Sequence, residues 1–218
     1  MKNIIFIAPP AAGKGTQSDM LVEKYGYIHI STGDLLRAEI ASGSELATEI
    51  SKIIEAGQLV SDELVATLLT NRLSQEDVKQ KGFILDGYPR NIAQAKTLES
   101  ILEDTNNSID AVIYLDLDQE TAMNRALGRM TCSNCKKGYN KFIDNLKPLN
   151  EGICDVCGAS LETRSDDNEE TFKARFQTYV DSTSPLLEFY KAAGLLTTVN
   201  SLSDKDEIFE RIESVIQW

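Results

Sequence analysis

The sequence predicts an α/β fold, a doubly wound parallel sheet of five strands that carries two inserts. Short apolar runs alternate with helical patterns along most of the chain, which is typical of βαβ units. The first run, Asn-Ile-Ile-Phe-Ile-Ala, lacks the alternation of a half-exposed strand, so it is expected to be buried on both faces. The length of 218 residues, 42% of them apolar, fits one sizeable domain with small inserts. In such a sheet, ligands bind at the carboxyl ends of the strands.

Five runs rich in β-branched and aromatic residues are the expected strands: 3–8, 27–31, 82–86, 111–117 and 195–200. The first ends at Pro9-Pro10, which cannot continue a strand within a sheet. Between and after these runs, helical patterns cover 13–25, 61–73, 91–103, 118–126, 168–190 and 205–216. Pro185 falls inside one of these patterns, so that helix is expected to kink or break there. The last helix is amphipathic and closes the chain.

Two segments interrupt the alternation and are expected to be inserts. Residues 31–60 predict two helices, with breaks at 42–44 and at Gly57. Residues 128–167 contain all four cysteines, several glycines and Pro148, and they predict a small loop-rich insert. The expected division is therefore core at 1–30, 61–127 and 168–218, with inserts at 31–60 and 128–167.

Charge and composition exclude several classes of protein. The chain has 34 acidic and 22 basic side chains, a net charge of -12, which argues against binding nucleic acid polymers or anionic membrane surfaces. His29 is the one histidine, which leaves little room for a histidine-rich metal centre. No apolar run approaches the roughly 18 residues of a membrane span, and none resembles a secretory signal. We therefore expect a cytoplasmic protein.

The first strand leads into Ala8-Pro9-Pro10-Ala11-Ala12-Gly13-Lys14-Gly15-Thr16, which matches the back half of a phosphate-binding loop. Backbone N–H groups at the start of the next helix would bind phosphate oxygens, Lys14 would add a point charge, and Thr16 would help to hold Mg²⁺. The tetrapeptide Gly-Lys-Gly-Thr alone is equally compatible with an ordinary strand-to-helix turn. The strand before it and the helix after it favour the phosphate loop.

Four further motifs follow in order: Ser31-Thr32-Gly33-Asp34-Leu35-Leu36-Arg37, Gly57-Gln58-Leu59-Val60-Ser61-Asp62-Glu63, Asp86-Gly87-Tyr88-Pro89-Arg90 and Arg164-Ser165-Asp166-Asp167-Asn168-Glu169-Glu170-Thr171. Through these motifs and their spacing, the chain closely resembles bacterial adenylate kinases of the long form with a zinc-binding lid, from the first strand to at least Asn200. The resemblance implies a P-loop NTPase-like fold and a monomer. It also implies reversible, Mg²⁺-dependent phosphoryl transfer from ATP to AMP, giving two ADP.

The phosphate loop departs from the family pattern, which usually has glycine at the positions of Ala8 and Ala11. If either position needs a positive φ, alanine would cost about 1 to 2 kcal/mol there. Its methyl group would also crowd a backbone that has to approach phosphate closely. We therefore expect a loop that still binds nucleotide, with a shifted conformation or a weaker affinity.

Six of the eight arginines fall on positions that match functional arginines of the family: Arg37, Arg90, Arg125, Arg129, Arg164 and Arg175. Guanidinium groups suit bidentate phosphate contacts. By resemblance, Arg37 and Arg90 would hold the monophosphate, Arg125 and Arg129 the donor phosphates, and Arg164 and Arg175 would bridge both. For any single arginine, a solvated or salt-bridged surface residue is the better explanation, but for the set it is not. The candidate catalytic residues are Lys14, Asp86, Arg90, Arg125, Arg129, Arg164 and Arg175, and Arg37 is a candidate for binding the monophosphate.

Asp86 ends an apolar strand, so its carboxylate should face the crevice and help to bind Mg²⁺ through water; a helix N-cap is the alternative. A phosphate nucleophile is already ionised and needs no base, so we expect His29 to be a packed or partly exposed strand residue. Asp166 and Asp167 would pair with nearby cations in a closed form, or equally form a solvated turn.

The resemblance implies two nucleotide sites. The ATP site would comprise Ala11, Ala12, Gly13, Lys14, Gly15, Thr16, Arg125, Arg129, Gly138 and Tyr139. The AMP site would comprise Thr32, Arg37, Gln58, Leu59, Val60, Gly87, Tyr88, Pro89, Arg90, Gln94, Arg164 and Arg175. Gln58 stands where many relatives have lysine, a change that matters little if the backbone makes the contact.

The cysteines form two close pairs, Cys132-x2-Cys135 and Cys154-x2-Cys157, separated by eighteen residues. This spacing is typical of a four-cysteine zinc site. Four thiolates would leave no open position for water, so the metal would be structural and would help the insert to fold. Two disulfides are the alternative, disfavoured in a reducing cytosol. Iron is another possible occupant of such a site.

Two other functions stay open. A kinase of the same class could use GTP as donor or a different monophosphate as acceptor. From a different class, the altered loop would suit a low-activity nucleotide-binding sensor or a zinc-ribbon interaction module. Six clamp arginines and Asp86 argue against a binding module, because binding alone does not require charge around the transferred phosphoryl group. The acidic excess would then lie outside a locally basic crevice.

Overall fold

The computed structural model describes residues 2–44, 46–56 and 58–216; the break expected at Gly57 therefore lies outside the described residues. The predicted five-stranded parallel sheet is confirmed, in the order β2-β3-β1-β4-β8. Its strands are β1 (Ile4–Ile7), β2 (Ile28–Ser31), β3 (Phe83–Asp86), β4 (Ala111–Asp116) and β8 (Leu196–Asn200). Each begins and ends within one or two residues of the expected bounds.

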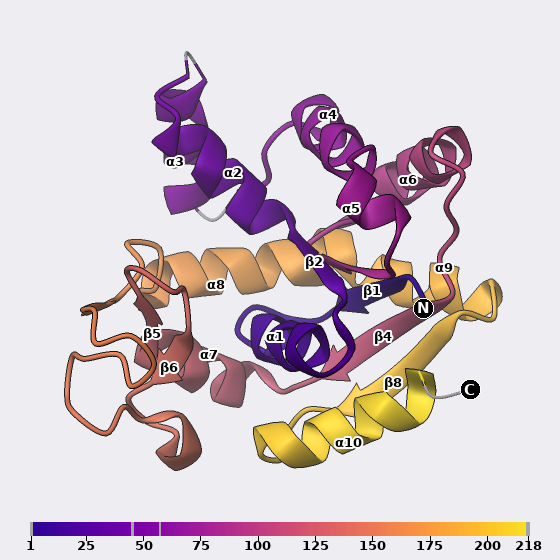
Figure 1. Ribbon diagram of the computed structural model, residues 1–218. Coiled ribbons are helices and arrows are strands. Elements are labelled where there is room, and N and C mark those ends of the chain that lie inside the picture. Colours follow the sequence, from indigo (N-terminus) through magenta and orange to yellow (C-terminus); the bar gives the residue numbers. More distant parts are fainter. Residues whose placement is uncertain (1, 45, 57, 217–218) are drawn as a thin grey trace.

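The continuous apolar run of β1 is explained by helices on both faces of the sheet (Figure 1). Ile5 and Ile7 face a core formed with α4 (Asp62–Leu73), α6 (Ile92–Asp104) and α9 (Pro185–Ala192). Ile4 and Phe6 face a second core formed with α1 (Lys14–Tyr25), α7 (Gln119–Gly128) and α10 (Lys205–Ile216). All four side chains are at most 2% exposed. Because alternate residues enter opposite cores, neither face of this strand can be polar.

The helices of the core follow the predicted patterns: α1 (Lys14–Tyr25), α4 (Asp62–Leu73), α6 (Ile92–Asp104), α7 (Gln119–Gly128), α8 (Glu169–Thr178), α9 (Pro185–Ala192) and α10 (Lys205–Ile216), with a short α5 (Glu76–Lys79). Side chains of Ser61, Asn91, Asp118 and Asn168 accept hydrogen bonds from backbone N–H groups in the first turns of α4, α6, α7 and α8. These caps satisfy donors that a helix leaves unpaired and fix where each helix begins.

The first insert contains α2 (Thr32–Ala41) and α3 (Ala47–Glu55), the two helices that the sequence predicts. The second insert is more ordered than the predicted loop-rich segment. It contains an antiparallel sheet in the order β6-β5-β7, formed by β5 (Arg129–Cys132), β6 (Gly138–Asn140) and β7 (Leu161–Glu162), and a 3-10 turn at Asp144–Leu146. Strands of two to four residues leave too few side chains for a recognisable alternation, which explains why the sequence did not indicate them.

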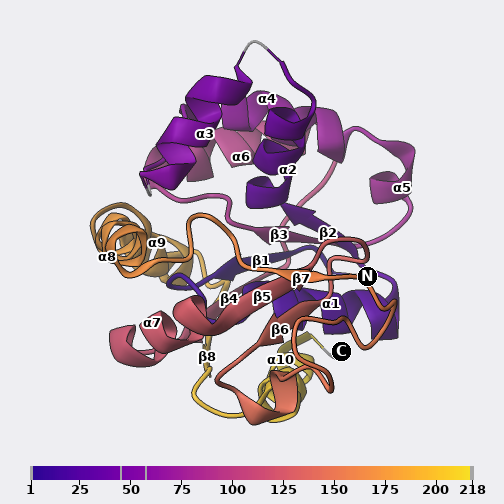
Figure 2. The same cartoon turned by 90° about the vertical axis from the view of Figure 1, so that its left-hand side faces the viewer.

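The helical pattern at 168–190 is broken before Pro185, as expected. A π-helical turn, Tyr179–Thr183, separates α8 from α9, and Pro185 occupies the first turn of α9. Figure 2 views the molecule from the side on which both inserts lie, with α2 and α3 above the sheet and the strands β5, β6 and β7 in front of it. Within the described residues, no helix combines the length and apolar character needed to cross a membrane.

Candidate functional site

A cavity of about 830 Å³ lies between the end of β1, the first insert and the second insert. Its walls include the loop before α1, the end of β3, part of α2 and the strands β5 and β6. The carboxyl ends of β1 and β3 meet there, as the fold class predicts. The volume is in the upper part of the range of ligand pockets, which suits a ligand or ligand pair larger than one small molecule.

The loop after β1 has the backbone conformation of a tight turn into a helix. Ala11 has a φ of 60° and Gly13 a φ of 100°, both in the left-handed region. No described residue other than glycine, Ala11, Asn106 and Lys136 has a positive φ, so Ala8 carries no strain of this kind. The first turn of α1 contains no acidic side chain, which leaves the positive end of the helix dipole open to an anion.

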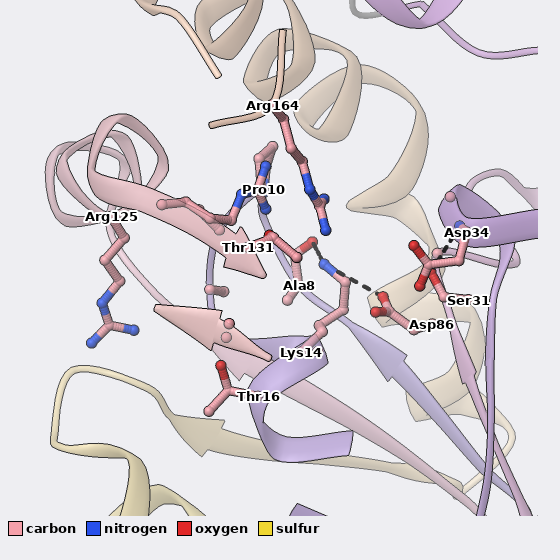
Figure 3. Close-up of a pocket in the computed structure, with 18 of the residues that line it drawn as sticks. Ala8, Pro10, Lys14, Thr16, Ser31, Asp34, Asp86, Arg125, Thr131 and Arg164 are labelled. Atoms are coloured by element: carbon pink, nitrogen blue, oxygen red, sulfur yellow. Dashed lines mark hydrogen bonds and ion pairs between the residues drawn. The ribbon is translucent and has the colours of Figure 1, made fainter. Parts of the chain in front are cut away.

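Lys14 points into the cavity from the first turn of α1 (Figure 3). Its ammonium lies 3.5 Å from the carbonyl oxygen of Ala8 and 4.0 Å from Asp86 Oδ1, so neither contact is tight. Burial and the nearby charges of Arg90, Arg175 and Arg129 lower its pKa, although Asp86 opposes the shift. A phosphate oxygen at this position would relieve both effects.

Asp86 ends β3 beside Lys14 and His29, as the apolar strand before it predicts. Its Oδ2 lies 3.5 Å from His29 Nε2. Burial opposes a charged carboxylate, but the neighbouring His29 and Lys14 outweigh burial and lower the pKa of Asp86 to about 2. Burial likewise opposes a charged His29, but Asp86 outweighs it and raises the histidine pKa. Asp86 is therefore ionised at neutral pH, as a carboxylate that helps to hold a cation must be.

Three of the candidate arginines are held by aspartates. Arg129 makes a bidentate pair with Asp167, Arg175 lies 2.7 Å from Asp166, and Arg37 lies 2.7 Å from Asp34. Asp166 and Asp167 therefore pair with cations, and their side chains are only 9% and 1% exposed, so the alternative of a solvated turn is wrong.

The other three arginines differ in their surroundings. Arg90 donates from Nε to the carbonyl oxygen of Gly87 at 2.8 Å. The guanidinium of Arg164 points toward Lys14 (Figure 3) and makes no hydrogen bond or ion pair within residues 2–44, 46–56 and 58–216. Arg125 lines the cavity but points away from Lys14 and contacts the carbonyl oxygen of Ser203 at 3.5 Å.

The electrostatics favour binding of a polyanion. Burial, followed by repulsion from Arg175, lowers the pKa of Arg90 to about 10, and burial with repulsion from Arg129 and Arg37 lowers that of Arg164 to about 10. Such depressed values mean that the cations repel one another in a partly desolvated space. Phosphate groups placed among them would compensate that repulsion, which is the property of a nucleotide phosphate site.

The structure divides the other predicted nucleotide contacts into two groups. Residues at the cavity wall are Ala11, Ala12, Gly13, Gly15, Thr16, Gln58, Leu59, Val60, Gly87, Pro89, Gly138 and Tyr139. Thr32, Tyr88 and Gln94 lie behind the wall and are at most 3% exposed. Thr32 donates to the carbonyl oxygen of Gly87 at 2.8 Å, and Gln94 accepts from the N–H of Arg90 at 2.7 Å. These two residues brace the β3–α6 loop; a direct contact of either with a base stays a prediction.

Sequence reasoning assigned no role to several residues that support the site. Asp34 lies in the same motif as Ser31, and its spacing of three residues from Arg37 indicates an ion pair on a helix. Asp62 accepts from Gln94 Nε2 at 2.7 Å, and Thr183 donates to the carbonyl oxygen of Arg90 at 2.9 Å. Neither of these long-range contacts leaves a local pattern in the sequence.

The four cysteines meet in the second insert, and each is a free thiol. Their sulfur atoms all lie within 4.8 Å of one another, with Cys132 3.4 Å from Cys157 and Cys135 3.5 Å from Cys154. A tetrahedral metal with bonds of about 2.3 Å would place its sulfur ligands about 3.8 Å apart. The cluster is therefore preorganised for a metal ion, and Tyr139 packs against it with its hydroxyl 3.4 Å from Cys154 Sγ.

Comparisons with known proteins agree with this geometry. The sequence model of the family described as "Adenylate kinase" matches residues 6–195. Similar chains include proteins described as adenylate kinase from Thermosipho africanus, 42% identical over 99% of both chains, and from Thermodesulfovibrio yellowstonii, 44% identical over 98% of both chains. A protein of the same description from Methanosarcina barkeri is 42% identical over 99% of this chain and 98% of its own. The chain therefore belongs to the adenylate kinase family, and with it to the nucleoside monophosphate kinases.

Proposed function

We propose that this chain transfers a phosphoryl group reversibly between Mg²⁺-bound ATP and AMP, giving two ADP. The observation that carries the proposal is that Lys14, six arginines and an ionised Asp86 all line one cavity at the carboxyl ends of the strands. Transfer between two polyanions needs in-line placement and cations around the transferred group, and it needs no base when the acceptor is a phosphate. The site supplies these cations.

The position of Lys14 divides the cavity into a donor and an acceptor part. The donor phosphates would lie on the N-terminal turn of α1, with Lys14, Arg129 and, after lid movement, Arg125. The acceptor phosphate would lie near Arg37 and Arg90, and the acceptor base would lie beside the backbone of 58–60. Thr32 and Gln94 would brace the β3–α6 loop, which carries Arg90. Arg164 and Arg175 would contact both phosphates.

Mg²⁺ bound to the donor phosphates supplies charge neutralisation. Asp86 fits the task of holding it through water, because its carboxylate is ionised, 14% exposed and directed at the cavity. Thr16 at the same wall offers a hydroxyl for the ion. The bidentate pairing of Arg129 with Asp167 keeps that guanidinium oriented, although it would have to share its charge with phosphate.

The cysteine cluster would hold a structural zinc ion in a lid that comprises residues 128–167. The support is the set of four thiols at nearly the spacing of a tetrahedral site, with no position left for water. Residues 31–60 would form the acceptor insert, and the remaining segments the core. Movement of both inserts would exclude water, which competes with AMP as acceptor. We further propose a cytoplasmic monomer.

A coupled assay with AMP, CMP, UMP, GMP and dTMP as acceptors, and with ATP and GTP as donors, tests the assignment. Rapid turnover with ATP and AMP and slow turnover with the other acceptors is expected. A preference for another monophosphate would show a kinase with different base selectivity. Nucleotide binding with no turnover for any pair would favour the sensor.

A further inference from the structure

The π-helical turn between α8 and α9 adapts the chain to Pro185. Proline has no N–H and its ring conflicts with the carbonyl group four residues before it, so an α-helix cannot pass through it unchanged. Here the N–H of Ser184 donates to the carbonyl oxygen of Tyr179 at 2.9 Å, a bond one residue longer than in an α-helix. Such turns often occur at functional sites, and Tyr179 and Thr183 both line the cavity.

Thr183 is the last residue of this turn, and it is 9% exposed. Its hydroxyl donates to the carbonyl oxygen of Arg90 at 2.9 Å, across 93 residues of sequence. Because most of Thr183 is buried, a partner inside the protein satisfies its hydroxyl in place of water. The contact is therefore a specific bond between the α8–α9 junction and the loop that presents Arg90.

Arg90 depends on side-chain contacts because it lies between β3 and α6, outside any helix or strand. Its N–H donates to Gln94 Oε1 at 2.7 Å and its Nε donates to the carbonyl oxygen of Gly87 at 2.8 Å. Both partners lie within four residues of Arg90; Gly87 belongs to the same loop, whereas Gln94 lies in α6 and is held by Asp62. Thr32 holds the Gly87 end of the loop, and Thr183 supplies a long-range bond to Arg90 itself.

We propose that Thr183 is a positioning residue that fixes Arg90 for the acceptor phosphate. The inference rests on the proposed function, in which Arg90 contacts AMP. Loss of the Thr183 hydroxyl would let the Arg90 backbone shift and would weaken binding of AMP more than binding of ATP. Arg175 on α8 precedes the π-helical turn, so the same continuous segment would help to place two of the phosphate-binding arginines.

The test compares Thr183→Val, Thr183→Ala and Thr183→Ser by steady-state kinetics, with KM determined separately for AMP and ATP. Valine keeps the volume and alanine avoids any steric conflict, so a folded variant without the hydroxyl is obtained in at least one case. Both are expected to raise the KM for AMP by about three- to tenfold, the effect of one hydrogen bond. The KM for ATP should change less than twofold, and serine should restore the wild-type values.

Thr70→Val is the matched control, because it removes a hydroxyl that bonds the carbonyl oxygen of Ala66 within α4, away from the cavity. It should leave both KM values unchanged. An unchanged KM for AMP in the valine and alanine variants would overturn the inference. So would equal increases for AMP and ATP, or a serine variant as impaired as valine.

Calorimetric titration with AMP provides a second readout in a double-mutant cycle. If Thr183 acts through Arg90, adding Thr183→Val to Arg90→Ala should not weaken AMP binding further. Additive losses would overturn the inference. A wild-type chain that makes no ADP from ATP and AMP would instead refute the proposed function. An active wild type whose Thr183 variants behave like Thr70→Val would refute the role of Thr183 alone.

Discussion

Replacement of Ala11 by glycine measures the strain in the phosphate loop. Ala11 has a φ of 60°, a conformation that costs a non-glycine residue about 1 to 2 kcal/mol. Glycine would remove that cost, but it would add about 0.4 to 1 kcal/mol of unfolded-state entropy. The half-buried methyl group contributes about 0.4 kcal/mol, half the value of a buried methylene. The free energy of unfolding should therefore stay the same or rise by up to about 1 kcal/mol.

The neighbouring Ala12 provides the matched control, because it is 1% exposed and has no positive φ. Ala12→Gly relieves no strain and loses a fully buried methyl group, worth about 0.8 kcal/mol, in addition to the entropy term of about 0.4 to 1 kcal/mol. It should lower the free energy of unfolding by about 1.5 kcal/mol. The two variants are thus expected to differ by about 2 kcal/mol.

Urea unfolding followed by circular dichroism measures both values, and the slope should be the same in the two variants. Equal losses at positions 11 and 12 would refute the strain argument. Calorimetric titration with ATP then shows whether the strain affects function. Because Ala11 already adopts the left-handed conformation, unchanged affinity in Ala11→Gly would mean that the alanine is neutral for binding. Tighter binding would mean that the alanine weakens it.

Three further predictions concern the lid, the arginines and Asp86. If the cysteine cluster holds a metal, treatment with a chelator followed by return of Mg²⁺ should lower both Tm and activity, and Zn²⁺ should restore them. Sensitivity to a reductant instead of the chelator would indicate disulfides, and elemental analysis distinguishes zinc from iron. Arg164→Ala should reduce kcat by about 10²-fold or more with little change in the free energy of unfolding, because Arg164 has no ion-pair partner within the described residues. Arg129→Ala should instead cost about 3 kcal/mol of stability by leaving the buried Asp167 uncompensated. Equal stability of the two variants would contradict this contrast. Because the folded-state pKa of Asp86 is low, its ionised carboxylate stabilises the fold by about 2 kcal/mol above its unfolded pKa of about 3.8, and this stabilisation is lost as pH falls toward about 2. Asp86→Asn should therefore flatten the decline of the unfolding free energy below pH 5. An unchanged decline would show that another group titrates.

Much of the fold could be predicted because its signals are local. The unalternated run of β1 predicts a strand covered on both faces, and Pro185 predicts an interruption of the helix. The two short strands of the lid sheet on either side of β5 could not be predicted, since two or three residues show no periodicity. Both strands pair with β5, and β7 does so from far along the chain.

The candidate site shows the same division. The cysteines, Lys14 and Asp86 were identified because their chemistry and spacing are written in short motifs, and the structure brings each set together. The conformation of Ala11 required coordinates, because the sequence shows a missing glycine but not whether the position needs a positive φ. The roles of Asp62 and Thr183 depend on contacts across 32 and 93 residues, which no local pattern indicates.

The stoichiometry of ATP consumption in the presence and absence of AMP tests most directly whether the cavity transfers a phosphoryl group between two nucleotides. We expect each ATP consumed with AMP to give two ADP and no free phosphate, because the cations of one cavity hold both nucleotides around the transferred group. Without AMP, ATP should remain essentially intact. Consumption of ATP at a similar rate without AMP, with release of phosphate, would contradict the central claim that this cavity transfers a phosphoryl group between two nucleotides.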